Sequence, residues 1–107
     1  MRVIAFDRFR PGVTMETIQP LLAEEVANVW RLWKSGVVRE NYARADEPGV
    51  IIVFEVESVA AARALVAEFP MTKAGYLEWD YVPLMAPVML ESQFSEAALE
   101  WASRPAA

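Results

Sequence analysis

Two strand–helix–strand patterns follow one another within the first 84 residues, and this order constrains the fold more than any other feature of the sequence. The first strand is predicted at residues 2–9, and its apolar run is typical of a strand inside a sheet. Strands at residues 37–44 and 50–56 flank the turn sequence Asp46-Glu47-Pro48-Gly49, which predicts a hairpin. A last strand is predicted at residues 76–82.

Two helices are predicted between these strands. Thr14 can cap the first helix, in which leucine, valine and tryptophan recur at helical spacing. Pro20 predicts either a kink in that helix or a short turn at residues 14–18 before its main part. Ser58 can cap the second helix, which Pro70 ends.

The order β-α-β-β-α-β predicts an α+β fold of the ferredoxin-like type, with one four-stranded antiparallel sheet and both helices on one face. On the third strand, alternation places Ile52 and Phe54 toward the helices and Ile51, Val53 and Glu55 on the opposite face. That opposite face is still largely apolar. We therefore expect a dimer in which two sheets face each other and enclose a cavity with a few polar groups.

Composition narrows the function further. The chain has 107 residues, which suits one domain, and it contains no cysteine and no histidine. Disulfides, thiolate metal sites and histidine-dependent catalytic triads are therefore excluded, and proton chemistry would use Asp, Glu, Lys or Tyr. We expect no metal and no organic cofactor.

Charge and hydropathy indicate which partners to expect. A net charge of -5 argues against binding nucleic acid. No apolar run is long enough for a membrane span or a signal sequence, so we expect a cytoplasmic protein that does not bind membranes.

Residues 1–90 are predicted to form the folded protomer, and residues 91–107 a C-terminal helical tail.

Several segments resemble the muconolactone isomerases and their small relatives over about residues 1–90. They are Ser35-Gly36-Val37-Val38-Arg39-Glu40, Glu57-Ser58-Val59 with Ala61-Ala62-Arg63-Ala64-Leu65, Phe69-Pro70, and Val82-Pro83-Leu84. The resemblance implies a dimeric α+β barrel that can assemble further. It also implies a pocket for a small ring compound, often carboxylated or oxygenated.

The second strand carries the substrate-binding residues that this resemblance implies. Arg39 matches an arginine of the family that would bind a substrate carboxylate, and the next position, typically histidine in these isomerases, is Glu40 here. Tyr42 on this strand, or Tyr76 at the start of the last predicted strand, would donate a hydrogen bond to a substrate oxygen. Arg39 and Tyr42 alternate across the sheet, so they share one cavity only if a bulge intervenes. Alternatively, the charges of this edge strand only guard against aggregation.

Asp7 and Glu55 are the candidates for moving a proton. Asp7 ends an apolar strand, where burial would raise the pKa of its carboxyl group, and Glu55 is predicted to face the cavity. The alternative for Asp7 is an ion pair with Arg8, Arg10 or Arg39, and the alternative for Glu55 is a pair at the interface rim.

Aromatic residues are numerous enough to form part of a pocket wall. Tyr76 and Trp79 are predicted to contact the substrate, whereas Trp30 and Trp33, which follow the apolar stripe of the first helix, are predicted to belong to the core.

We therefore expect a proton-transfer isomerase, active as a homodimer or larger homo-oligomer, on a cyclic carboxylate, lactone, aromatic or polyketide-like compound. One alternative is a cofactor-free monooxygenase or cyclase. Another is a non-catalytic small-molecule-binding or accessory subunit, which the missing histidine favours.

The C-terminal tail has a pattern of its own. Ser95 can cap a helix over residues 96–103, and the apolar residues Phe94, Ala98, Leu99 and Trp101 of this segment recur near helical spacing. We expect the tail to pack on a neighbouring subunit, with packing on its own helices as the alternative.

Overall fold

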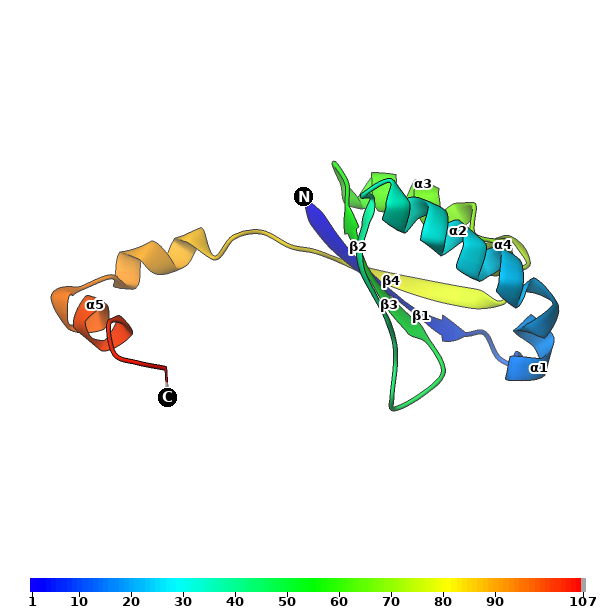
Figure 1. Ribbon diagram of the computed structural model, residues 1–107, viewed down its shortest axis with the longest axis horizontal. Coiled ribbons are helices and arrows are strands. Elements are labelled where there is room, and N and C mark those ends of the chain that lie inside the picture. Colours follow the sequence, from blue (N-terminus) through cyan, green and yellow to red (C-terminus); the bar gives the residue numbers. More distant parts are fainter. Residues whose placement is uncertain (107) are drawn as a thin grey trace.

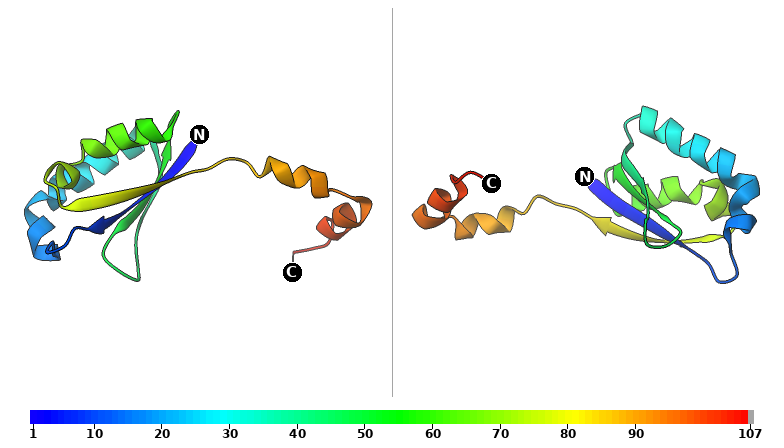
Figure 2. Two further views of the ribbon diagram at one scale, coloured as in Figure 1. Left: turned by 180° about the vertical axis from the view of Figure 1, so that it is seen from behind. Right: turned by 60° about the horizontal axis from the view of Figure 1, so that its bottom comes forward.

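The computed structural model describes residues 1–106 and contains one antiparallel sheet of four strands in the order β2-β3-β1-β4 (Figure 1). The strands are β1 (Arg2–Phe9), β2 (Val38–Ala43), β3 (Val50–Glu55) and β4 (Leu77–Pro83). The helices are α1 (Met15–Ile18), η1 (Gln19–Leu21), α2 (Leu22–Lys34), α3 (Val59–Ala67), α4 (Pro70–Lys73), η2 (Val88–Gln93) and α5 (Glu96–Ala102). Helices α2 and α3 lie on the same face of the sheet in all three ribbon views (Figure 2). The predicted ferredoxin-like α+β fold is therefore confirmed.

The segment before α2 contains the short turn that was one of the two predictions for Pro20. Thr14 and Thr17 form a reciprocal capping box around α1, and Pro20 lies in the first turn of η1. Proline is tolerated at that position because its missing N–H would have no partner inside the helix. The main helix α2 begins at Leu22, directly after the last residue of η1.

The core lies between the helices and the facing side of the sheet. It is formed by fully or almost fully buried side chains from both layers: Val3, Ala5, Leu32, Val38, Ile52, Phe54, Ala62, Val66 and Phe69. The rings of Phe54 on β3 and Phe69, after α3, lie 6.5 Å apart at the centre of this cluster. The prediction that Ile52 and Phe54 face the helices is confirmed.

The edge strand β2 contains a β-bulge. Val38 pairs with Phe54, but Glu40 pairs with the next residue of β3, so Arg39 is the extra residue of β2. Because side chains alternate across a strand, one extra residue moves those that follow to the opposite face. Glu40 and Tyr42 therefore lie on the outer face of the sheet, away from the helices.

The outer face of the sheet has an apolar centre and charged ends. Its centre contains Ile4, Phe6, Ile51, Val53 and Val82, by alternation from the residues that face the helices. Arg8 forms ion pairs with Glu78 and Asp80 near one end of this face, and Arg2 approaches Glu55 near the other. The helices leave this face uncovered, as the ribbon views show (Figure 2).

Trp30 and Trp33 do not belong to the core, contrary to the prediction. They are 57% and 51% exposed, and their rings stack with centroids 5.0 Å apart. The physical reason lies in β2, which presents Asn41 and Ala43 toward α2. These side chains are too small or too polar to fill the space beneath two indole rings, so a cavity remains there.

Residues 84–106 project away from the sheet and helices (Figures 1 and 2). The tail contains η2 and α5, and Ser95 caps α5 by accepting a hydrogen bond from the backbone N–H of Ala98 over 3.2 Å. The tail does not lie on α2 or α3 of its own chain. No helix among residues 1–106 combines the length and apolar character needed to cross a membrane.

Candidate functional site

A cavity of about 620 Å³ lies inside the protomer, between α2 and the sheet face that the helices cover. It therefore lies on the side of the sheet opposite to the face where the sequence had placed a cavity. Its wall is mostly apolar and comes from β1, α1, α2, β2, β3, α4 and the start of β4. The lining includes Phe9, Met15, Ile18, Leu22, Val26, Val29, Trp30, Trp33, Val50, Ile52, Phe69, Met71 and Leu77, with Asp7, Glu25, Asn41 and Arg44 as its larger polar members.

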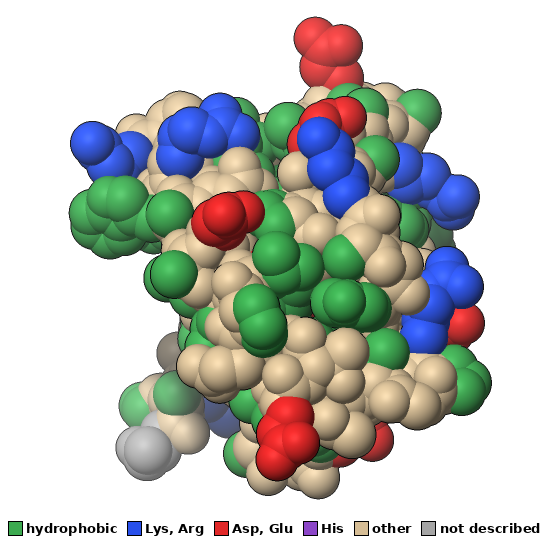
Figure 3. Space-filling model, turned by 90° about the vertical axis from the view of Figure 1, so that its right-hand side faces the viewer, with side chains coloured by type: hydrophobic (Ala, Val, Ile, Leu, Met, Phe, Trp, Pro, Cys, Tyr) green, Lys and Arg blue, Asp and Glu red, His purple; other side chains and the backbone are tan. Residues whose placement is uncertain are grey.

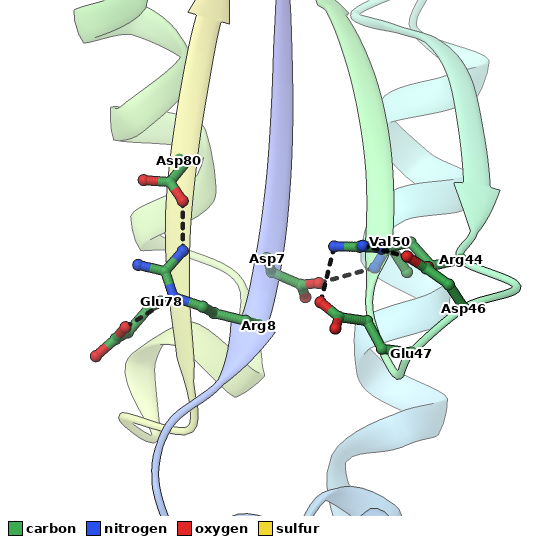
Figure 4. A network of polar contacts seen from close by, with 8 residues as sticks. All are labelled: Asp7, Arg8, Arg44, Asp46, Glu47, Val50, Glu78 and Asp80. Carbon is green, nitrogen blue, oxygen red and sulfur yellow. Dashed lines mark hydrogen bonds and ion pairs between the residues drawn. The ribbon is translucent and has the colours of Figure 1, made fainter.

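Asp7 places a carboxyl group in this wall. The residue is 5% exposed, and its Oδ1 accepts a hydrogen bond from the backbone N–H of Val50 over 2.8 Å. Burial raises the pKa of Asp7, while this hydrogen bond opposes the rise by stabilising the charged form. Figure 4 shows the carboxyl group directed toward β3 and the turn before it. None of the ion pairs proposed as an alternative, with Arg8, Arg10 or Arg39, forms in the described chain.

Arg44 stabilises the turn between β2 and β3, and the hydrogen bond from the Val50 N–H keeps the end of this turn close to Asp7. The Arg44 guanidinium group binds Asp46 over 2.6 Å and Glu47 over 2.9 Å, as Figure 4 shows, and it lowers the pKa of Asp46 to about 2. Gly49 lets the turn approach, because a Cβ atom there would lie 3.0 Å from Asp7 Oδ1 and 3.1 Å from the Asp7 carbonyl oxygen. Its φ of +154° also favours glycine.

Glu25 on α2 is a second carboxyl group in the same cavity, and the sequence analysis missed it. The residue is half-buried, and its Oε1 accepts a hydrogen bond from the backbone N–H of Met71 over 3.1 Å. Burial is the main cause that raises the pKa of Glu25, and the charge of Asp7 adds to it. The sequence did contain a signal for this position. Glu25 precedes Val29 by four residues and Leu32 by seven, which places its carboxyl group on the apolar side of α2.

The mouth of the cavity is apolar and aromatic. Met15, Val26, Trp30 and Trp33 line the cavity while more than half of each residue is exposed. Figure 3 views the end of the molecule at which α1 lies and shows hydrophobic side chains at its centre, with charged side chains around them. The cavity thus opens to solvent beside α2, with the two carboxyl groups in its wall.

The substrate-binding residues predicted on β2 lie outside this cavity wall. Arg39 is exposed at the bulge. The hydroxyl group of Tyr42 donates a 2.7 Å hydrogen bond to Glu40 on the outer face, which raises the pKa of Tyr42. Asn41 and Ala43 are the β2 side chains that reach the cavity, because the bulge reverses the alternation there.

The remaining predicted residues divide between the two faces. Glu55 lies on the outer face, with its carboxylate 3.7 Å from the Arg2 guanidinium group. Trp79 is directly opposite Asp7 in the β1–β4 ladder, and its Nε1 donates a 3.0 Å hydrogen bond to Thr72. Tyr76 packs on the buried cluster of Ile18, Met71 and Leu77, whose three residues line the cavity. The structure therefore brings Trp79 beside Asp7 and keeps Glu55 apart from both.

The carboxyl groups described here do not gather into a metal site. Within residues 1–106, no three acidic side chains lie close enough together to hold a metal ion.

Comparison with known proteins relates this chain to others by fold. No family model matches the sequence, and no curated protein matches it. Among solved structures, the chain is similar to 5-chloro-2-hydroxyhydroquinone dehydrochlorinase (TftG) from Burkholderia phenoliruptrix AC1100, which was solved in complex with 2,5-dihydroxybenzoquinone. The TM-score is 0.68 at 18% identity, covering 83% of this chain and 98% of that one. An uncharacterized NIPSNAP domain protein from Burkholderia xenovorans aligns with a TM-score of 0.43 at 16% identity, covering 81% and 97% of the two chains.

Proposed function

We propose that this protein binds a small oxygenated ring compound in the cavity beside α2 and moves a proton on it with Asp7. One observation carries the proposal: an apolar cavity with an aromatic mouth contains two carboxyl groups, Asp7 and Glu25, whose pKa values are raised by burial. Cavities of about 300–1,000 Å³ with a few polar groups are typical of small-molecule sites. Buried carboxyl groups of raised pKa are typical of general acids and bases.

The chemistry we propose is a double-bond shift, as in the muconolactone isomerases that the sequence resembles. The Asp7 carboxylate removes a proton from a carbon next to the ring carbonyl, and the electron pair of that C–H bond moves into the conjugated system. The protonated Asp7 then returns the proton to another carbon of the ring, so no atom is gained or lost. A raised pKa makes the Asp7 carboxylate a stronger base and keeps its protonated form accessible.

Glu25 is the second member of this proposed pair. Its charge and that of Asp7 repel each other across the cavity, so protonation of one favours ionisation of the other. We propose that Asp7 is ionised and Glu25 protonated in the active form. A protonated Glu25 could then donate a hydrogen bond to an oxygen of the ring.

The charges of the cavity favour a neutral ring over a free carboxylate. Asp7 and Glu25 are both acidic, and Arg44, the one cationic residue in the lining among residues 1–106, is already bound to Asp46 and Glu47. A lactone, phenol or quinone could enter without bringing another negative charge. The dehydrochlorinase of similar fold, with its quinone ligand, supports the class of small oxygenated ring compounds. Arg39 stays a candidate for an acidic group that extends past the mouth toward β2.

A proton-exchange experiment tests the role of Asp7. Muconolactone and its neutral methyl ester are incubated with the protein in D₂O, and deuterium entry at the acidic ring carbon is followed by NMR. Asp7→Asn should reduce exchange by about 10²–10⁴-fold, the range for loss of a general base. Glu55→Gln is the matched control and should leave the rate unchanged. A loss of exchange in Glu55→Gln but not in Asp7→Asn would place the base on the outer face of the sheet. An unaltered protein that exchanges no deuterium would refute the activity.

Affinity measured by calorimetry tests the ligand class separately. The methyl ester should bind more tightly than muconolactone, and Asp7→Asn should reduce this preference because it removes one negative charge. Arg39→Ala should weaken the binding of muconolactone alone if Arg39 holds its carboxylate. Equal binding of both ligands to all three proteins would contradict the charge argument.

We also propose that two copies pair through the outer faces of their sheets, as in the dimeric α+β barrel implied by the resemblance. The support is the apolar centre of that face, which includes Ile4, Phe6 and Ile51 and lacks a covering layer in the protomer. Phe6→Glu should shift the mass measured by light scattering toward that of the single chain. An unchanged mass would place the contact elsewhere.

A further inference from the structure

The C-terminal tail, which in the structure begins at residue 84, after β4, and not at residue 91 as predicted, carries apolar side chains that its own chain leaves uncovered. Met85, Met89, Phe94, Leu99 and Trp101 are each more than half exposed. Helix α5 has seven residues, and an isolated helix of that length is marginal in water, because forming the first turn costs more than the few later hydrogen bonds return. The tail therefore needs a surface to pack on.

Helix α5 is amphipathic and acidic on one side. Ala98 and Trp101 lie three residues apart and so share one side of the helix, and Phe94 precedes the N-cap residue Ser95. Glu96 and Glu100, four residues apart, share another. A surface that suits α5 must offer apolar groups next to positive charge.

Helix α2 offers such a surface beside the cavity mouth. The stacked rings of Trp30 and Trp33 are half exposed there, and Lys34 follows Trp30 by four residues on the same side of the helix. Arg39 is exposed on the neighbouring strand β2. In the part of the chain that the structure describes, neither Lys34 nor Arg39 forms a salt bridge.

The outer face of the sheet suits the tail less well. Its ends and its β2 edge carry four acidic residues, Glu40, Glu55, Glu78 and Asp80, against two arginines: Arg2 pairs with Glu55, and Glu78 and Asp80 share Arg8. These acidic groups would repel the acidic side of α5, whereas Lys34 and Arg39 would attract it.

The topology separates a tail from the α2 of its own chain. The tail leaves the end of β4, where the backbone N–H of Leu84 donates to the Arg2 carbonyl oxygen over 2.9 Å. Strand β4 forms one edge of the sheet, whereas α2 contacts β2 at the other edge. In every view the tail extends outward instead of around the body (Figures 1 and 2).

We infer that the tail of one copy packs on α2 of a second copy of this chain. Phe94 and Trp101 contact Trp30 and Trp33, and the acidic side of α5 faces the basic groups next to them. Because these two tryptophans line the cavity mouth, the tail of the second copy narrows the entrance. This inference does not rest on the proposed function, since it holds whether or not the cavity binds a ligand.

The absence of cysteine from the chain allows a direct test. Ala98→Cys on the tail and Ala27→Cys on α2 are made in separate proteins, one of them isotope-labelled, and Ala67→Cys on α3 serves as the matched control. Ala27 and Ala67 are both exposed alanines on helices of the same sheet face. The proteins are mixed in pairs and oxidised, and the disulfides are identified by mass spectrometry without reduction.

Disulfides between Ala98→Cys and Ala27→Cys chains should form at least about ten times faster than those with Ala67→Cys. Glu96→Lys with Glu100→Lys should reduce the rate about tenfold, because attraction becomes repulsion. Lys34→Glu with Arg39→Glu on the other chain should restore it. The inference is overturned if Ala27→Cys and Ala67→Cys react equally, or if disulfides between two tails predominate. It is also overturned if the Ala98→Cys/Ala27→Cys double variant closes a disulfide within one chain.

Discussion

Replacing Asp7 by Asn and by Ala separates its hydrogen bond from its charge. The Asn side chain keeps an oxygen that can accept the bond from the Val50 N–H, but it cannot ionise. The Ala side chain loses both the hydrogen-bond acceptor and the charge, and it leaves the part-buried Val50 N–H at the start of β3 without this partner. We expect Asp7→Ala to be less stable than Asp7→Asn by about 1–3 kcal/mol, the cost of one unsatisfied buried donor.

The pH dependence follows from the direction of the Asp7 pKa shift. The pKa is raised in the folded protein above its ordinary value of 3.8, so the folded state favours the neutral carboxyl group. That contribution to stability is complete below about pH 3.8 and is lost as the pH rises through the folded pKa. Asp7→Asn removes the ionisable group, so this variant does not lose that stability as the pH rises. Its stability relative to the unaltered protein should therefore increase with pH above 4 and then level off.

Urea unfolding, followed by circular dichroism at several pH values between 3 and 8, measures both effects. In a chain of this size, 1 kcal/mol corresponds to about 4–8 °C in Tm, so thermal unfolding provides an independent check. Equal stability of Asp7→Asn and Asp7→Ala would refute the role of the Val50 hydrogen bond. If the difference in unfolding free energy between Asp7→Asn and the unaltered protein does not change with pH, the argument that burial raises the Asp7 pKa is refuted.

Three further substitutions test the surroundings of the site. Gly49→Ala should cost about 1–3 kcal/mol in unfolding experiments, because its Cβ atom would crowd the Asp7 carboxyl and carbonyl oxygens and the backbone angle favours glycine. Phe54→Ala should cost about 3–5 kcal/mol, since the ring is fully buried between the sheet and helices, whereas a tolerance below 1 kcal/mol would contradict the core described here. Ser58→Ala should cost about 1 kcal/mol through loss of the hydrogen bond that caps α3, and Ser58→Gly should cost less.

Most of the fold could be predicted from the sequence because its signals are local. The capping residues Thr14, Ser58 and Ser95 start the helices where they were predicted, and Pro20 forced the short turn before α2. The apolar side of β3 could be assigned because two-residue alternation leaves one choice of face when Phe54 is buried.

The candidate site was less predictable, because it depends on features that no periodic pattern shows. The bulge at Arg39 depends on the pairing of β2 with β3, and it moves Tyr42 to the outer face. The exposure of Trp30 depends on which small side chains β2 presents beneath α2. Asp7 was predictable, since a carboxyl group in an apolar strand is unusual, whereas Glu25 was overlooked among the other acids of its helix.

A crystal structure of the protein soaked with muconolactone methyl ester tests the central proposal most directly. We expect the ring in the cavity beside α2, close to Trp30, with an acidic C–H carbon within about 3–3.5 Å of an Asp7 carboxyl oxygen. A ligand bound only on the outer face of the sheet, near Glu55, would contradict the proposal. So would a cavity that stays empty when the crystals are saturated with the ester.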